Sequence, residues 1–133
     1  MADWLVIGPV KNWQLAVEHK VWAVSPAQEK SWRSLSPGDR VFFYATAPVK
    51  GVVGWGSVAS TAVVEEPFWP EEKAKGHVLW PYRIRFQDIH VLPAADWQDR
   101  ALRIERQGIV FQRALQPVAS DRAETWRERL GLA

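Results

Sequence analysis

The chain has 133 residues, of which 47% are hydrophobic and 24% are charged, the balance of a globular protein with one sizeable core. It contains no cysteine, which excludes disulfides and cysteine-ligated metals and favours a cytoplasmic location. The net charge of +2 is mildly basic, so binding to a polyanion such as nucleic acid is allowed but not required.

Three further classes of protein are disfavoured by local patterns. No run of residues approaches the ~18 apolar positions of a membrane span. The opening MADWLVIG has neither the basic region nor the cleavage site of a secretion signal. The three histidines, at positions 19, 77 and 90, do not have the spacing of a metal site. We therefore expect one domain over residues 1–133, with no membrane partner, no metal and no cofactor.

The first half of the chain predicts strands separated by short helices. An apolar run ending at Gly8 indicates a buried strand, and Asn12 is a suitable N-cap for the helix that follows it. Ser25 and Gln28 have the spacing of a capping box at a second helix start. The predicted strands are residues 3–8, 21–24, 40–46 and 51–60, and the predicted helices are residues 11–20 and 25–35.

Two glycines distinguish the 51–60 strand. Gly54 and Gly56 leave one face of this strand almost without side chains. Because glycine weakens a strand interior, the pattern indicates close approach of another backbone, a bend, a ligand or a tight barrel corner.

Residues 65–80 predict a long irregular loop, which in a compact domain is often functional. The segment combines two prolines and three large aromatic residues with the acidic pairs at positions 65–66 and 71–72. We interpret these acidic pairs as solvated charges rather than as a catalytic pair.

The last part of the chain predicts one long strand and two helices. Alternation in YRIRF predicts a strand over residues 82–91, and the change of parity at Gln87 and Asp88 indicates a bulge. Helices are predicted over residues 95–106 and 121–130, the second with a capping box of Asp121 and Glu124, whereas residues 108–115 are ambiguous. Together the elements predict an α+β, β-dominated fold, with five to six strands in a curved sheet or partly closed barrel flanked by short helices.

Nine tryptophans are the most unusual feature of the composition. Aromatic side chains pack cores, but they also stack on bases and enclose methylated groups, so the excess favours a ligand site. No GxSxG, P-loop, GxGxxG or HExxH motif occurs, and we therefore predict a protein that is not an enzyme. The indoles assigned to packing alone are Trp4, Trp32, Trp97 and Trp126.

An ordered series of motifs along nearly the whole chain resembles the EVE domain, a member of the PUA-like superfamily that also contains the YTH readers of methylated adenine. The series is DWLVIG at 3–8, NW at 12–13, VWAVS at 21–25, SPGDRVFFY at 36–44, GVVGWGSV at 51–58, EPFWP at 66–70, WPYRIRF at 80–86 and a helix start at 119–124. Two positions depart from the family pattern. Trp55 stands where an aliphatic residue is common, and Ala23 follows Trp22 where related domains more often have glycine.

The resemblance implies a PUA-like pseudo-barrel with a pocket for an extruded base. EVE domains are similar to readers of modified bases, with 5-methyl- and 5-hydroxymethylcytosine in DNA proposed for several. In the YTH relatives an aromatic cage holds the base, and one cage tryptophan lies in a segment similar to residues 22–25. A second cage position falls in the irregular loop. The base-binding candidates are Trp22, Asn12, Trp13, Trp69, Ser25, Trp80, Phe68 and Trp55, and the phosphate-binding candidates are Arg83, Arg85 and Arg113.

Each candidate has a simpler alternative in packing, helix capping or solvation, and two other functions stay open. One is a less selective RNA-binding PUA-like domain. The other is a hydrolase of modified nucleosides similar to ASCH proteins, which would need a lysine and a carboxylate converging in the pocket. The lysines near the predicted pocket segments are Lys11 and Lys20, the latter close to Glu18.

Overall fold

Six strands form one sheet in the order β2-β5-β4-β3-β1-β6, as seen in a computed structural model that describes residues 1–132. Only β1 and β3 are parallel, and every other neighbouring pair is antiparallel. The strands are β1 (Asp3–Gly8), β2 (Val21–Val24), β3 (Arg40–Ala45), β4 (Gly51–Val63), β5 (Tyr82–Val91) and β6 (Leu115–Val118).

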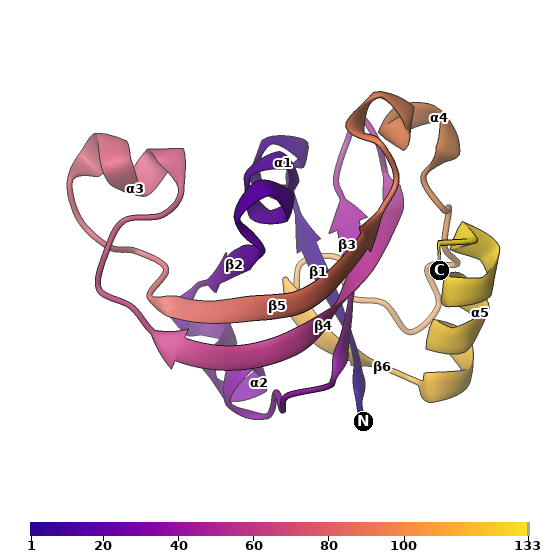
Figure 1. The fold of residues 1–133 in the computed structure, drawn as a ribbon, viewed down its shortest axis with the longest axis horizontal. Coiled ribbons are helices and arrows are strands. Elements are labelled where there is room, and N and C mark those ends of the chain that lie inside the picture. The colour runs from indigo at the N-terminus through magenta and orange to yellow at the C-terminus, as the bar shows by residue number, and fades with distance from the viewer. Residues whose placement is uncertain (133) are drawn as a thin grey trace.

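The long strands β4 and β5 curve together and curl the sheet into a half-barrel (Figure 1). Their pairing changes register where Gln87 is skipped opposite Val58, so the bulge predicted at this position is confirmed. A Cβ atom added to Gly54 would overlap the carbonyl oxygen of His90, which confirms the close approach of a neighbouring backbone. The predicted α+β, β-dominated pseudo-barrel is confirmed.

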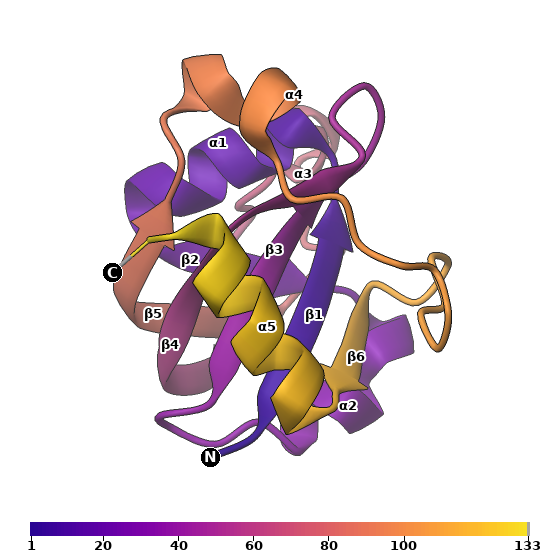
Figure 2. The ribbon, with the colours of Figure 1, turned by 90° about the vertical axis from the view of Figure 1, so that its right-hand side faces the viewer.

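Within residues 1–132, five α-helices and two short 3₁₀ turns flank the sheet. Figure 2 shows α5 lying across one face of the sheet, and α1 lies on the other side. The α-helices are α1 (Val10–His19), α2 (Glu29–Arg33), α3 (Pro70–Lys75), α4 (Trp97–Arg100) and α5 (Ser120–Leu130), and the 3₁₀ turns are η1 (Pro26–Gln28) and η2 (Ala94–Asp96).

Several predicted helix starts and lengths are wrong. Helix α1 is capped by Pro9, so Asn12 lies within the first turn instead of preceding it. Ser25 precedes η1 without a side-chain capping bond, and the predicted 25–35 helix divides into η1 and α2. The predicted 95–106 helix is only η2 and α4, because Ala101 adopts an extended conformation.

The predicted capping box at α5 is also absent. Glu124 binds Arg40 at 3.0 Å and Arg127 at 2.5 Å instead of returning to the helix start, because buried Arg40 emerges from β3 beside it. Arg40 also binds Asp3 at 2.7 Å, so these ion pairs connect α5 to the first and third strands.

The two faces of the sheet carry separate aromatic clusters. Because neighbouring residues of a strand point to opposite faces, Phe43 packs toward α1 against Trp13, whereas Phe42 packs toward α5 against Trp126. The indoles predicted to serve packing alone, Trp4, Trp32, Trp97 and Trp126, are all buried.

Candidate functional site

A cavity of about 280 Å³ opens where the ends of β1 and β2 meet the start of α1, the start of α3 and the start of β6. Three indoles line it together with polar and aliphatic groups. The lining residues are Ile7, Gly8, Pro9, Lys11, Asn12, Trp22, Ala23, Val24, Ser25, Trp69, Pro70, Glu71, Trp80, Ala114 and Leu115. Five of the eight predicted base-binding residues are therefore brought together, namely Trp22, Asn12, Trp69, Ser25 and Trp80.

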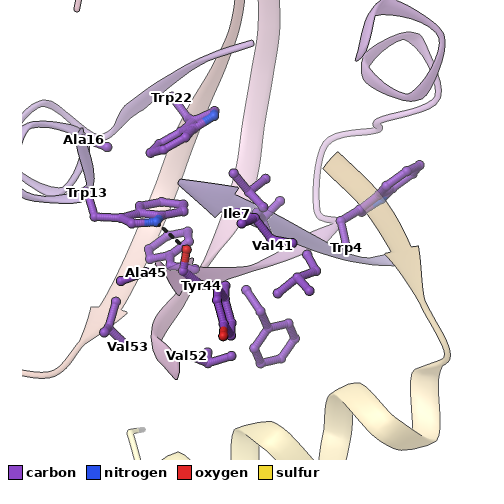
Figure 3. Packing of buried hydrophobic residues seen from close by; sticks show 14 of the residues in the cluster. Trp4, Ile7, Trp13, Ala16, Trp22, Val41, Tyr44, Ala45, Val52 and Val53 are labelled. Atoms are coloured by element: carbon purple, nitrogen blue, oxygen red, sulfur yellow. Dashed lines mark hydrogen bonds between the residues drawn. The ribbon is translucent and has the colours of Figure 1, made fainter. Parts of the chain in front are cut away.

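The Trp22 indole is held in place by a stack of rings behind it (Figure 3). Its centroid lies 4.0 Å from that of Trp13, and the Trp13 centroid lies 4.5 Å from that of Phe43. Trp13 is fully buried and donates its indole N–H to the carbonyl oxygen of Tyr44 at 2.8 Å. Because Trp13 covers one face of the Trp22 ring, only the opposite face and the ring edges can contribute to the cavity.

Glycine at position 8 is required by the placement of Trp22. A Cβ atom added there would overlap the six-membered ring of Trp22, so any larger residue would displace the indole. The last residue of β1 therefore sets the position of a side chain on β2.

Trp69 meets Trp22 nearly at right angles. The two ring centroids are 4.8 Å apart, and the ring planes are inclined by 68°. Trp69 is 4% exposed and donates its indole N–H to the carbonyl oxygen of Ala23 at 3.2 Å, which ties the loop to β2. A flat ligand parallel to Trp22 would therefore meet Trp69 at a steep angle rather than lie between two parallel rings.

The predicted loop at residues 65–80 contains helix α3 and a buried acid. Glu72 is 0% exposed, so its interpretation as a solvated charge is wrong. Its carboxylate accepts four backbone N–H groups, from Phe68 at 3.1 Å, Trp69 at 2.9 Å, Leu79 at 2.9 Å and Trp80 at 3.1 Å. Burial alone would raise the pKa of Glu72, but the four N–H donors outweigh burial and hold the pKa below its usual value.

No local pattern in the sequence fully predicts this role of Glu72. An acidic residue at the third position of a short helix is the acceptor half of a capping box, which accounts for its bond to Trp69. The bonds to Leu79 and Trp80 depend on the return of the chain after α3, which no local pattern predicts.

The three predicted phosphate contacts lie in different environments. Arg83 is 6% exposed, donates to the carbonyl oxygens of Trp80 and Glu66, and lies over the ring of Phe68. Its guanidinium is thus bound to the loop that carries Trp69 and Trp80. Arg85 is exposed on β5.

Arg113 does not line the cavity but is adjacent in sequence to its lining. It is exposed, precedes the lining residue Ala114, and donates to the hydroxyl of Ser31 at 3.2 Å.

Three other base-binding candidates lie outside the cavity lining. Trp13 lies behind Trp22, as described above. Phe68 packs against Trp69 with ring centroids 4.7 Å apart. Trp55 lies on the α5 side of the sheet, where its ring is 6.4 Å from Phe42 and 4.3 Å from His90.

Polar side chains at the cavity are available to a ligand. Asn12 and Ser25 are half-buried, and their side chains make no hydrogen bond within residues 1–132. Lys11 and Glu71 add one charge of each sign to the lining. By contrast, Lys20 and Glu18 are exposed near the end of α1 and do not line the cavity.

No helix within residues 1–132 is long and apolar enough to cross a membrane. Within that range, no group of three or more histidine, aspartate or glutamate residues is arranged to hold a metal ion.

Comparisons with known proteins identify a family and a shared fold. The EVE domain model matches residues 2–124. A UPF0310 protein of Pyrococcus abyssi is 30% identical over 97 residues, which is 68% of each chain. Among solved structures, the ASCH protein of Zymomonas mobilis has a TM-score of 0.64 at 12% identity and is aligned over 96% of this chain and 94% of its own. The YTH domain of Mmi1, solved in complex with RNA, has a TM-score of 0.59 at 15% identity over 98% of this chain and 77% of its own.

The two structural likenesses show a shared fold. Because the family match extends over residues 2–124 of the 133, the chain belongs to the EVE domain family.

Proposed function

We propose that this EVE domain binds nucleic acid and holds one extruded, modified base in the cavity beside Trp22. The observation that carries the proposal is the convergence of three indoles and two hydrogen-bonding side chains on one cavity of about 280 Å³. That volume is close to the lower limit of about 300 Å³ for small-molecule sites, which suits a single base rather than a larger ligand.

The energetics of base binding are consistent with these residue types. A base that leaves its stack loses a few kcal/mol of stacking and pairing, least when it is already single-stranded. Stacking on an aromatic side chain returns about 1–3 kcal/mol. Because Trp22 and Trp69 are inclined by 68°, the proposed base would stack on one indole and meet the other at a steep angle.

Selectivity for a modified base would come from two sources. A methyl or hydroxymethyl group adds polarisable surface that an aromatic, water-excluding cavity favours. Asn12 and Ser25 would read the hydrogen-bonding edge of the base, since both side chains line the cavity without internal partners. Exposed Arg85 and Arg113 would bind phosphates without regard to sequence. The related fold of the Mmi1 YTH domain, solved with RNA, supports a nucleic-acid partner.

A direct binding comparison tests this function. One oligonucleotide sequence, as single strand and as duplex, as DNA and as RNA, would carry cytosine, 5-methylcytosine, 5-hydroxymethylcytosine, adenine or N6-methyladenine at one position. We expect one modified form to bind at least tenfold more tightly than its unmodified counterpart. Equal affinities would overturn modified-base reading in favour of a less selective nucleic-acid-binding domain.

One observation favours a hydrolase as a second candidate. Lys11 and Glu71 both line the cavity and supply the lysine and carboxylate that such an enzyme needs. Incubation with modified nucleosides tests this candidate. Turnover that is lost in Lys11→Ala would support it, and the absence of turnover with any nucleoside that binds would exclude it.

A further inference from the structure

Residues 64–81 form one wall of the cavity, and hydrogen bonds hold the two ends of this segment together at two places. At its base, the backbone N–H of Val64 donates to the carbonyl oxygen of Pro81 at 2.8 Å, where β4 ends and β5 begins. At its centre lies the Glu72 carboxylate. One oxygen accepts the N–H groups of Phe68 and Trp69, and the other accepts those of Leu79 and Trp80.

Each arm of this wall carries one indole of the cavity. Trp69 lies on the arm that precedes α3 and Trp80 on the arm that follows it. Because Glu72 binds the backbone N–H groups of both tryptophans, one carboxylate fixes the relative position of the two arms. Arg83 binds the same arms through the carbonyl oxygens of Glu66 and Trp80.

Burying a carboxylate to hold a loop closed costs free energy, which indicates that the carboxylate has a specific role. Removing a charge from water is costly unless hydrogen bonds replace the lost hydration. An ionised carboxylate has about four lone-pair sites, and four N–H donors occupy them here. The direct partners of the Glu72 carboxylate are these four backbone N–H groups, and the guanidinium of Arg83 also interacts with its charge through space.

We propose that Glu72 is a positioning residue for the cavity and holds Trp69 and Trp80 in their binding arrangement before a ligand arrives. A wall that is already ordered does not have to be ordered during binding, and this preorganisation raises affinity without any contact between Glu72 and the ligand. The identity of the ligand as a base rests on the function proposed above, whereas the preformed wall does not.

The first test needs no ligand. Amide hydrogen exchange of the intact protein would follow the N–H groups of Phe68, Trp69, Leu79 and Trp80. We expect these four to exchange as one unit in the wild type and to lose at least tenfold of their protection in Glu72→Gln, while amides of β3 change little. Glu65→Gln, which removes an exposed charge from the same segment, is the matched control and should leave all four unchanged.

Two results of this exchange test would overturn the proposal. One is unrelated exchange rates of the four amides in the wild type, which requires no variant and so remains decisive if Glu72→Gln does not fold. The other is unchanged protection of the four amides in a folded Glu72→Gln protein.

The second test measures binding to an oligonucleotide carrying 5-hydroxymethylcytosine, or whichever modified base binds best. Glu72→Gln should weaken binding at least tenfold. Leu130→Ala, which removes a buried side chain from α5 on the opposite side of the sheet, controls for a general loss of stability. Equal weakening by both variants, with each protein folded under the assay conditions, would assign Glu72 a merely structural role and overturn the proposal.

The two tests separate the proposals. If the wild type binds no oligonucleotide, the proposed function fails, and the exchange measurements still decide whether Glu72 orders the wall.

Discussion

Trp13 and Trp22 are stacked with ring centroids 4.0 Å apart and ring planes inclined by 27°, yet only Trp22 lines the cavity. Trp13 is the layer behind it, fixed by its bond to the Tyr44 carbonyl and by its contact with Phe43. The cavity thus has a lining indole on β2 and a supporting indole on α1.

Trp22→Ala should weaken oligonucleotide binding by about tenfold to a hundredfold, because it removes a stacking surface that contributes about 1–3 kcal/mol. Trp22→Phe keeps an aromatic ring stacked on Trp13 and should therefore lose less affinity than Trp22→Ala. Equilibrium titration checks both, together with a melting curve to establish that each variant is folded. An affinity unchanged in Trp22→Ala would show that the base does not stack there.

Gly8→Ala should cost about 1–3 kcal/mol of folding stability, because the new methyl group overlaps the Trp22 ring in a packed region. The same change in a Trp22→Phe background should cost less, since the smaller ring leaves room. Urea unfolding of the four proteins gives the coupling energy of this double-mutant cycle. Additive costs would mean that Gly8 and Trp22 do not constrain one another.

Folding stability should fall as the pH drops below 4.5, the ordinary pKa of a glutamate side chain. The pKa of Glu72 is lowered in the folded state, so its stabilising effect is present above pH 4.5 and is lost as the folded protein takes up the proton. Glu72→Gln should be less stable at neutral pH, where each poorly paired N–H group costs about 1–3 kcal/mol, and its deficit should shrink on acidification. Urea midpoints from pH 7 to pH 3 measure this difference, and a constant deficit would contradict the assignment.

Glu124 should contribute to the same acid dependence. Its bonds to Arg127 and Arg40 lower its pKa to about 2, so the stability it provides is lost between about pH 4.5 and pH 2. Glu124→Gln should therefore flatten the stability curve in that window, without the loss of amide protection expected for Glu72→Gln.

The salt dependence of binding should separate the three arginines. Arg85→Gln and Arg113→Gln remove exposed charges and should each lower the slope of log affinity against log salt by roughly one unit. Arg83→Gln should instead reduce stability, because its buried guanidinium binds the carbonyl oxygens of Trp80 and Glu66. Titrations at several salt concentrations test the slopes, and a lower slope in a folded Arg83→Gln protein would assign that residue to a phosphate.

Much of the fold was predictable from the sequence alone. Runs such as DWLVIG and RVFFYAT indicate buried strands through their composition, and the change of parity at Gln87 indicates a bulge. A close backbone, which the structure shows at Gly54, is among the alternatives that the glycines of β4 indicate. Each of these signals depends only on neighbouring residues, so it predicts local structure without knowledge of the rest of the chain. The ordered motifs also indicated the family and placed Trp22 and Trp69 among the site candidates.

Only the tertiary structure decided which aromatic residues line the cavity and which support it. Trp13, Trp22 and Trp55 are all base-binding candidates by sequence, but the tertiary structure places one behind the cavity, one at its lining and one on the opposite face of the sheet. The same holds for Glu71 and Glu72, neighbours of identical chemistry, of which one is exposed and the other accepts four backbone hydrogen bonds. Burial and hydrogen bonding depend on segments that are distant in the chain, and this is the physical reason that residue type and spacing could not separate them.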